Sequence, residues 1–371
     1  MNEQPRVRVA VVFGGRSTEH AISCVSAGSV LDALDRDRYH VVPVGISRSG
    51  RWVLAPDDAT SLAIRDGRLP EVDDGGAAVV LAGDPTAAGL VVTEPGDVPR
   101  ALGAVDVVFP LLHGPYGEDG TLQGLLELAG VPYVGSGVLA SALAMDKAMA
   151  KLVLAAAGLP VGSYEVVTDR AWSHDPDAAL AQVRATLTLP VFVKPARAGS
   201  SVGISKVESW DQLGAAIEVA RAHDPKVVVE QGAHGREIEC GVLEGLDGGP
   251  PESSVCAEIK VVGDHPFYDF DAKYLDDATE LVVPADVPGT VQDAVQRMAV
   301  AAYEELGCEG MARVDFFLAT DGSLVVNEVN TIPGFTPRSM FPRMWAASGL
   351  DYPALVDRLL TTAMARRQGL R

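Results

Sequence analysis

Runs of hydrophobic residues mark out the first part of the chain. Val7–Phe13 is an unbroken, valine-rich run, and Val41–Ile46 and Val105–Pro110 repeat the pattern. Such runs are typical of strands that are buried on both faces of a parallel sheet. Helix-length stretches separate them, and the first helix is predicted from about Ser17. We therefore expect alternating strands and helices, closed by a strand at Val131–Val134.

Helical and strand patterns also organise the middle of the chain, whereas residues 55–100 are rich in Gly, Pro, Asp and Ala and predict loops. One long helix is predicted over Val138–Ala157, where a glycine and a proline end it. Ser209 and Gln212 have the spacing of a capping box, which predicts the start of another helix. A third helical stripe covers residues 295–306. Four further segments have the composition of strands: Pro190–Lys194, Lys226–Glu230, Arg236–Leu243 and Ser254–Val261.

Residues 311–330 alternate between apolar and polar side chains on both sides of Asp321-Gly322. Asp-Gly in such a setting predicts a β-hairpin with a two-residue turn, which here pairs Thr320 with Ser323. Side chains two residues apart share one face of a strand. The apolar face of this hairpin includes three residues: Val314, Phe316 and Val329. The other face collects four polar residues: Arg313, Asp315, Glu328 and Asn330.

This polar face is the first candidate for chemistry. The register predicts Asp315 opposite Glu328 and Arg313 opposite Asn330. Charged groups on an otherwise apolar hairpin are costly to bury without a partner. A divalent metal with a phosphate is a natural partner, because oxygen ligands suit Mg²⁺ and arginine suits phosphate. The hairpin alone leaves a salt-bridged surface hairpin open as the alternative.

Composition and charge narrow the class of partner. The chain has 371 residues, enough for two or three domains, and it is 47% hydrophobic, enough for sizeable cores. A formal net charge of -20 argues against nucleic acid or an anionic membrane as a partner, because both bind basic faces. No apolar run approaches ~18 residues, so no segment is predicted to span a membrane.

Two further features suggest where the protein acts. The N-terminus lacks the apolar core of a signal peptide. The four cysteines are scattered and form no CxxC pair: Cys24, Cys240, Cys256 and Cys308. They are predicted to be buried thiols in a reducing compartment. We therefore expect a soluble, cytoplasmic protein.

Two motifs of the first part place polar residues at the ends of predicted strands. In FGGRSTEH a glycine turn follows a strand, and Glu19 lies in the first helical turn, where it either holds a ligand ammonium or only complements the helix dipole. The full GxGxxG pattern of dinucleotide sites is absent. In LLHGPYGEDG, His113 lies at a strand end, where open α/β sheets bind ligands. Glu118 and Asp119 of the same motif could simply begin the next helix.

Three later motifs contain residues suited to binding phosphate, closing over a site or stabilising an oxyanion. In FVKPARAGSSVG, Lys194 precedes a Gly-Ser loop that could hold phosphate or be a surface turn, and it is not a Walker A sequence. FYDFDAKYL lies in residues 263–283, where Lys273 and Tyr274 could close over a site or only pack locally. In NEVNTIPGFTPRSMFP, the turn after the carboxylate–amide pair could present backbone N–H groups to an oxyanion.

Taken together and in this order, these motifs resemble D-alanine–D-alanine ligases of the ATP-grasp superfamily, from about Val9 to about Asp357. The resemblance implies an α+β / α/β ATP-grasp fold. It implies an N-terminal Rossmann-like domain at 1–137, a central α+β subdomain at 138–231 and a C-terminal antiparallel-sheet subdomain at 232–371, whose lid loop is 263–283. ATP is expected between the central and C-terminal sheets.

The resemblance also implies a reaction. ATP phosphorylates the carboxylate of a first D-alanine, and the amine of a second D-alanine attacks the acylphosphate, which yields a dipeptide for peptidoglycan. The implied cofactors are ATP and two Mg²⁺ (or Mn²⁺) ions. The implied assembly is a homodimer, with no nucleic-acid or membrane partner.

Site residues carry over position by position. The implied metal ligands are Asp315, Glu328 and Asn330. The implied nucleotide contacts are Lys147, Lys194, Ser200, Ser201, Glu230, Gln231, Ala233, Glu237, Phe267 and Lys273. The implied substrate contacts are Glu19, His113, Arg313, Ser339 and Met340, and the implied catalytic set is Glu19, Ser200, Tyr274, Arg313 and Gly334.

Three competing functions stay open on the sequence. A D-alanine–D-lactate ligase has the same fold, but its loop typically lacks the tyrosine that is present here as Tyr274. Another ATP-grasp carboxylate–amine ligase is disfavoured by FGGRSTEH and by the Ser339-Met340 pair. A non-catalytic nucleotide-binding regulator would be expected to lack a metal ligand or a phosphate lysine, and all are present.

Overall fold

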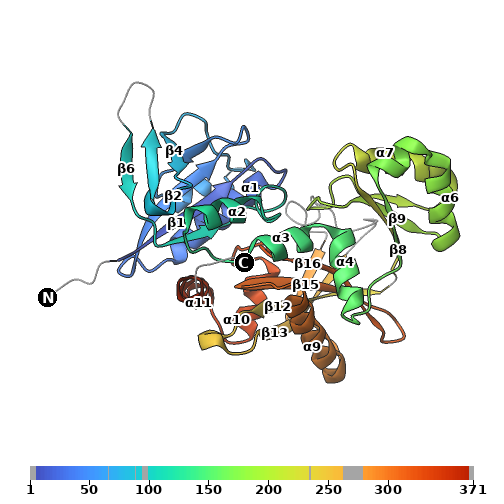
Figure 1. The fold of residues 1–371 in the computed structure, drawn as a ribbon. Coiled ribbons are helices and arrows are strands. Elements are labelled where there is room, and N and C mark those ends of the chain that lie inside the picture. The colour runs from blue at the N-terminus through green and yellow to red at the C-terminus, as the bar shows by residue number, and fades with distance from the viewer. Residues whose placement is uncertain are drawn as a thin grey trace.

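The computed structural model describes residues 6–65, 67–87, 89–93, 99–233, 235–261 and 279–366. Within these residues the strands form three sheets, one from each third of the chain, with helices packed on them (Figure 1). The three sheets are called the N-terminal, central and C-terminal sheets. The predicted α/β and α+β content is confirmed.

The N-terminal sheet has the order β6-β5-β4-β3-β2-β1-β7. Its strands are β1 (Val7–Gly14), β2 (Tyr39–Ile46), β3 (Trp52–Leu54), β4 (Ala78–Leu81), β5 (Leu90–Thr93), β6 (Arg100–Gly103) and β7 (Val107–Pro110). The strands β2, β1 and β7 are parallel and the others antiparallel. Its helices are α1 (His20–Ala33), which starts three residues later than predicted, and α2 (Thr121–Ala129).

Side chains of β1 enter cores on both faces of the sheet, as its continuous apolar run predicts. The prediction of loops for residues 55–100 is wrong in part, because this segment contributes β4 and β5 and leads into β6. These strands have four residues each, and in β4 the side chain of Val79 is buried while that of Val80 is half exposed. Their short alternation is masked in the sequence by the Gly- and Pro-rich connections between them.

The central sheet has the order β10-β9-β11-β8. Its strands are β8 (Tyr164–Val167), β9 (Val191–Pro195), β10 (Ser205–Val207) and β11 (Val227–Gln231). Its helices are α5 (Asp169–His174), α6 (Pro176–Thr186) and α7 (Leu213–Arg221). The capping box of Ser209 and Gln212 is present, and it precedes a short 3-10 turn that leads into α7.

The C-terminal sheet has the order β14-β13-β12-β15-β16 and is antiparallel throughout. Its strands are β12 (Arg236–Leu243), β13 (Glu252–Val261), β14 (Thr279–Val282), β15 (Met311–Leu318) and β16 (Leu324–Asn330). The helix α9 (Gly289–Glu305) packs on one face, and α10 (Met340–Ala347) packs on β12 and β13 from the other. All four cysteines are buried free thiols, as predicted.

The helix predicted over Val138–Ala157 is two helices, α3 (Val138–Met145) and α4 (Lys147–Ala156). Asp146 separates them with an extended backbone, and its carboxylate accepts a hydrogen bond from Met149 N at 3.2 Å as the cap of α4. An aspartate is a favourable N-cap, so the break has a local cause. Both helices pack on the C-terminal sheet. The predicted domain bounds stay a prediction.

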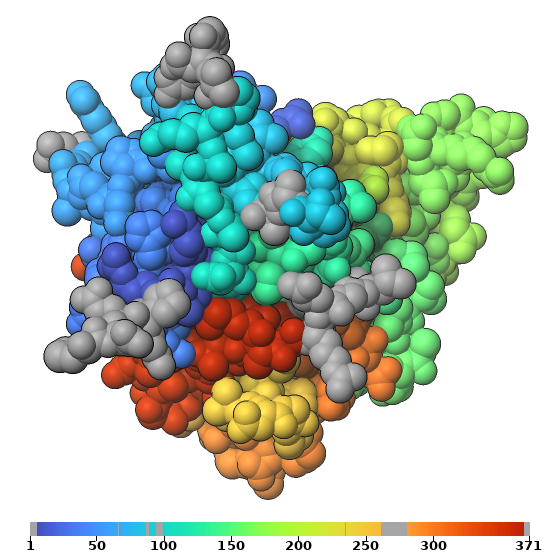
Figure 2. Space-filling model, turned by 60° about the vertical axis from the view of Figure 1, so that its left-hand side comes forward, coloured from blue at the N-terminus to red at the C-terminus, as the bar shows by residue number. Residues whose placement is uncertain are grey.

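The last helix, α11 (Tyr352–Ala365), joins the N-terminal and C-terminal sheets. One core contains Val9 and Phe109 of the N-terminal sheet together with Phe341 of α10 and Leu359 of α11. In Figure 2 the red surface of the last helices lies between the blue surface of the first residues and the yellow and orange surface of the residues that precede these helices in the chain. The two sheets therefore share a core.

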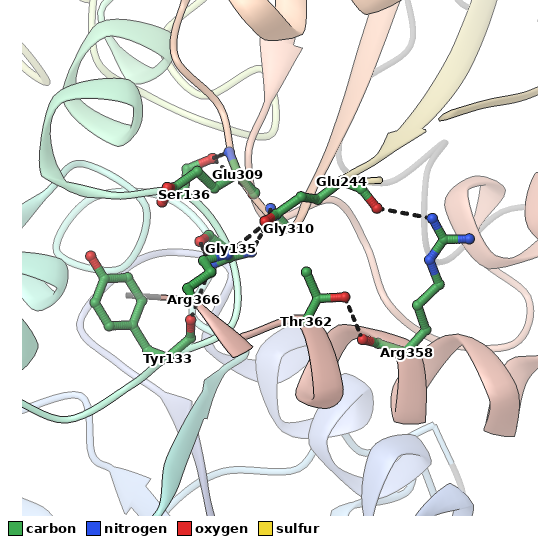
Figure 3. Close-up of polar contacts among 9 residues, drawn as sticks. All are labelled: Tyr133, Gly135, Ser136, Glu244, Glu309, Gly310, Arg358, Thr362 and Arg366. Carbon is green, nitrogen blue, oxygen red and sulfur yellow. Dashed lines mark hydrogen bonds and ion pairs between the residues drawn. The ribbon is translucent and has the colours of Figure 1, made fainter. Parts of the chain in front are cut away.

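Beside this core lies a group of polar contacts that we call the junction cluster: Tyr133, Gly135, Ser136, Glu244, Glu309, Gly310 and Arg366 (Figure 3). Arg366 follows α11, and its Nε donates to Glu244 Oε2 at 2.7 Å. Its Nη1 donates to the carbonyl of Gly135 at 3.0 Å, and Gly310 N donates to Glu244 Oε2 at 2.8 Å. These bonds tie the end of the N-terminal segment to the C-terminal sheet.

Candidate active site

A cavity of about 860 Å³ is lined by residues of the central and C-terminal sheets and by helix and loop residues of the N-terminal part. This volume lies in the range of small-molecule sites, about 300–1,000 Å³. The structure brings together around it every predicted site residue that it describes: Glu19, His113, Lys147, Lys194, Ser200, Ser201, Glu230, Gln231, Ala233, Glu237, Arg313, Asp315, Glu328, Asn330, Gly334, Ser339 and Met340. Phe267, Lys273 and Tyr274 lie outside the described residues. The predicted lid loop 263–283 is wrong at its end, because residues 279–282 form strand β14, which pairs with β13.

The hairpin β15–β16 supplies the floor of the cavity. Asp315 pairs with Glu328 and Arg313 pairs with Asn330, as predicted. The predicted two-residue turn is wrong, since Ala319 pairs with Ser323 across a three-residue loop in which Gly322 has a φ of 85°. A bulge then restores the predicted register, because Asn327 is an extra residue of β16 that has no partner between Asp315 and Phe316 in the pairing of the strands.

Arg313 is the cation of this floor. Its Nε and Nη2 donate to the two oxygens of Asp315, each at 2.7 Å, and its Nε lies 3.2 Å from Glu239 Oε1. Asn330 Nδ2 donates to Asp315 Oδ2 at 3.0 Å. Burial alone would lower the pKa of Arg313, but Asp315 and Glu239 raise it well above its ordinary value. The guanidinium therefore stays charged beside two carboxylates that face the cavity.

The opposite wall carries the lysines. Lys194 of β9 donates to Glu230 Oε2 at 2.7 Å, and Lys151 of α4 lies 3.3 Å from Glu230 Oε1. Burial alone would raise the pKa of Glu230, but Lys194 and Lys151 lower it to about 2. Lys147 Nζ donates to the carbonyl of Ala198 at 2.8 Å, in the Gly-Ser loop. The carboxylate is thus ionised and surrounded by positive charge.

The Gly-Ser loop closes the cavity against the N-terminal segment. Ser200 Oγ donates a short hydrogen bond to Glu19 Oε1, so the predicted contact between these residues is present. A Cβ at Gly199 would lie 2.4 Å from Glu19 Oε2, so a larger residue there would displace the Glu19 carboxylate from its present position. Ser200 and Ser201 both have positive φ values, of 47° and 58°, a conformation that non-glycine residues seldom adopt. Such backbone is typical of loops that are held in a functional conformation.

His113 and Glu118 form the far wall. His113 Nδ1 lies 3.0 Å from the carbonyl of Ile332, which links the N-terminal sheet to the turn after β16. Burial lowers the pKa of His113, whereas burial and the nearby Glu19 raise the pKa of Glu118. Asp119 instead precedes the N-cap of α2, and its carboxylate accepts a hydrogen bond from Thr121 N at 3.0 Å.

The turn after β16 contributes the last predicted residues. Gly334 lines the cavity, and Ser339 is the N-cap of α10. Ser339 Oγ accepts from Thr336 N at 3.1 Å, which holds the turn together. Met340 is buried against Ile259 of β13 and also reaches the cavity.

Three residues of the site were missed by the sequence analysis or left undecided by it. Lys151 follows Lys147 by four residues, the spacing that places two side chains on one helix face. Glu239 follows Glu237 by two residues on β12, which places both on one face of the strand. Glu118 is the third, and one of its oxygens is buried with no hydrogen-bond partner among the described residues. The signals for the first two were therefore available in the spacing.

The hairpin offers side-chain oxygen atoms of the type that bind a divalent metal. Asp315, Glu328 and Asn330 offer two carboxylates and an amide, all oxygen donors that suit Mg²⁺. Among the residues that the structure describes, no three His, Cys, Asp or Glu side chains are grouped to hold a metal. A membrane-spanning helix is likewise absent from the described part of the chain.

Two sheets line one cavity, and one supplies lysines while the other supplies an arginine among carboxylates. This arrangement is that of an ATP-grasp ligase. Models of the "D-ala D-ala ligase" N-terminus and C-terminus match residues 8–136 and 153–361. A D-alanine--D-alanine ligase of Streptomyces griseus is 57% identical, covering 98% of this chain and 94% of that protein. One from Mycobacterium sp. (strain JLS) is 58% identical, covering 99% and 98%. The chain therefore belongs to the D-alanine–D-alanine ligase family.

Solved structures agree with this assignment of fold. The VanG D-Ala:D-Ser ligase of Enterococcus faecalis is similar with a TM-score of 0.83 and 36% identity, covering 97% of this chain and 100% of that one. The D-alanine-D-alanine ligase of Coxiella burnetii has a TM-score of 0.80 and 33% identity, covering 97% and 94%. The ATP-grasp fold that the sequence predicts is confirmed.

Proposed function

We propose that this chain joins two D-alanine molecules to D-alanyl-D-alanine at the expense of ATP, in the synthesis of peptidoglycan precursors. One observation carries the proposal. All the predicted site residues that the structure describes, from three separate parts of the chain, line one cavity. They do so in a chain that shares more than half of its residues with named D-alanine–D-alanine ligases.

The first step activates a poor acyl donor. A carboxylate oxygen of the first D-alanine attacks the γ-phosphorus of ATP, and ADP leaves, which gives D-alanyl phosphate. Phosphoryl transfer depends on alignment and charge neutralisation more than on covalent help. Lys147 and Lys194 hold the phosphates, and Arg313 neutralises the transferring group. Asp315, Glu328 and Asn330 would hold two Mg²⁺ (or Mn²⁺) ions, which would add positive charge at the phosphates.

The second step forms the peptide bond. The neutral amine of the second D-alanine attacks the acylphosphate carbon, the nitrogen gives up one proton, and phosphate leaves with the oxygen that came from the first carboxylate. Glu19 holds the ammonium of the first D-alanine, and Ser200 and Tyr274 fix Glu19. Arg313 and the N–H of Gly334 receive the negative charge of the tetrahedral intermediate, as oxyanion donors do. Ser339, beside Met340, holds the second carboxylate, and His113 borders this end of the site.

The nucleotide occupies the space between the central and C-terminal sheets. Glu230, Gln231 and Ala233 contact the adenine and Glu237 contacts the ribose. By the family resemblance, Phe267 and Lys273 are proposed as further contacts of the nucleotide; both lie outside the described residues. This arrangement is supported by the position of the four described residues on the cavity wall.

Two further proposals concern the cellular compartment and the oligomeric state. The chain acts in the cytoplasm, which its four free buried thiols favour, because such thiols need no oxidising compartment. It acts as a homodimer, on the strength of the family resemblance. Light scattering of the purified chain would report the mass of the assembly, and a monomeric mass at working concentration would overturn the dimer.

A release assay for phosphate tests the function. ATP and Mg²⁺ are incubated with D-alanine alone, with D-alanine plus D-lactate or D-serine, or with L-alanine, and the products are identified by mass. We expect phosphate and the dipeptide with D-alanine alone, and no product with L-alanine. A mixed product in the presence of D-serine would match the solved relative that is a D-Ala:D-Ser ligase. Absence of phosphate release with D-alanine would overturn the proposal.

A further inference from the structure

Helix α4 brings two lysines to the site, but only one of them lines the cavity. Lys147, at its start, is among the lining residues, whereas Lys151 lies behind the wall with a side chain only 4% exposed. A lysine this buried is unusual unless it is paired. Its Nζ lies 3.3 Å from Glu230 Oε1 and 3.4 Å from the carbonyl of Asn327.

These two partners belong to different sheets. Glu230 lies on β11 of the central sheet, and Asn327 is the extra residue of the bulge in β16. A bulge interrupts the ladder, so its backbone groups need other partners. Lys151 supplies one for the Asn327 carbonyl. The same bulge gives Glu328 its place opposite Asp315.

Glu230 has one lysine on each oxygen, and the two lysines differ in what they can do. Lys194 lines the cavity and holds Oε2 at 2.7 Å. If Lys194 turns toward the phosphates, as the proposed function requires, it leaves Glu230. Lys151 is buried and does not line the cavity, so we expect it to remain on Oε1. It therefore keeps the carboxylate ionised and in place while the nucleotide is bound.

We propose that Lys151 is a positioning residue that fixes Glu230 and the β16 bulge to each other. It thereby aligns the adenine end of the nucleotide site with the metal-binding face of the hairpin. The inference deepens the proposed function and rests on it, because it takes Glu230 as a nucleotide contact and Glu328 as a metal ligand. It predicts defects in nucleotide and metal use that leave D-alanine use nearly unchanged.

The test compares Lys151→Met and Lys151→Arg with Lys206→Met. Lys206 is a control on β10 of the central sheet, paired with the exposed Glu208 and absent from the cavity wall. We expect Lys151→Met to raise KM for ATP about tenfold to a hundredfold, the loss for a charged hydrogen bond. KM for D-alanine should stay within about twofold, and Lys151→Arg should recover part of the loss.

Two further readouts separate positioning from general structure. The preference for ATP over ITP, which lacks the 6-amino group, should fall in Lys151→Met. The Kd for Mg²⁺-ATP, measured by calorimetry in the absence of D-alanine, should rise, as should the Mg²⁺ concentration for half-maximal activity. Equal increases in both KM values with an unchanged ATP preference would overturn the proposal, as would values equal to the Lys206→Met control. Failure of the proposed function would differ, because the unmodified chain would then release no phosphate with D-alanine.

Discussion

Two groups of buried charges in this molecule use similar residues in different ways. In the junction cluster, Arg366 meets Glu244 and backbone carbonyls, and its side chain is 8% exposed. In the cavity wall, Lys194 and Lys151 both meet the one carboxylate of Glu230. The first group is balanced within the fold. The second leaves positive charge on one wall, across from carboxylates on the hairpin, and such unbalanced charge suits a ligand that carries phosphate and metal.

The comparison predicts that breaking the junction harms stability and not chemistry. Arg366→Met leaves Glu244 without its guanidinium, and the loss of one partner of a buried pair costs about 3–5 kcal/mol. Glu244 is 27% exposed, so we expect the lower end of this range. Urea titration gives the unfolding free energy, and kcat per folded molecule should stay within about twofold.

A matched control sharpens this prediction. Arg36→Met removes a pair with Asp57 in which both side chains are more than 40% exposed, so its cost should be below about 1 kcal/mol. Equal stability of the two variants would contradict a special role for the junction.

On the cavity wall we expect the opposite result: a substitution should reduce activity and leave stability nearly unchanged. Glu328→Gln keeps the shape of the side chain but replaces a charged carboxylate ligand by a neutral amide, so activity should fall by about 100-fold or more at fixed Mg²⁺, the upper range for changes around a metal site. The unfolding free energy should change little, because Glu328 faces the cavity rather than the core. Wild-type turnover at saturating Mg²⁺ would rule out Glu328 as a ligand.

Glu230 links charge on the cavity wall to stability through pH. Its pKa is lowered from an ordinary 4.5 to about 2, so the stabilisation is fully present above about pH 4.5 and is lost as the pH falls toward 2. The size is on the order of 3 kcal/mol. Glu230→Gln should therefore lose stability less steeply between these pH values. Parallel curves for the two proteins would show that Glu230 is not held by its lysines.

The smallest effect concerns the choice of nucleophile. Tyr274→Phe removes one polar partner in the proposed contact with Ser200 and Glu19, worth about 1–3 kcal/mol, or roughly tenfold to a hundredfold in rate ratio. The use of D-lactate relative to D-alanine should rise, most at acidic pH, where the free amine is scarcest. The depsipeptide-to-dipeptide ratio from pH 6 to 9 measures it. The same ratio in both proteins would exclude control by Tyr274.

The sequence predicted the site better than the details that build it. Residues such as Arg313 and Asp315 were correctly paired because the side-chain alternation of strands limits the options. The turn itself was wrong, and the bulge at Asn327 cancelled the error. A bulge depends on contacts with distant residues, here Lys151 of α4, which no local pattern contains.

Other differences have the same origin. The break at Asp146 was hidden inside a continuous apolar helix pattern, although aspartate is a good N-cap. The sequence does not decide whether Glu118 begins a helix or serves the site, because burial of its carboxyl depends on tertiary packing. Local pattern thus predicted which residues meet, and tertiary contacts decided how they are held.

The fate of one oxygen atom tests the central claim most directly. D-Alanine labelled with ¹⁸O in its carboxylate is incubated with the chain, unlabelled ATP and Mg²⁺, and the released phosphate is analysed by mass. An acylphosphate intermediate transfers one carboxylate oxygen to phosphorus, so the account predicts one ¹⁸O in each phosphate and one ¹⁸O lost from the first residue of the dipeptide. Unlabelled phosphate released together with the dipeptide would contradict it.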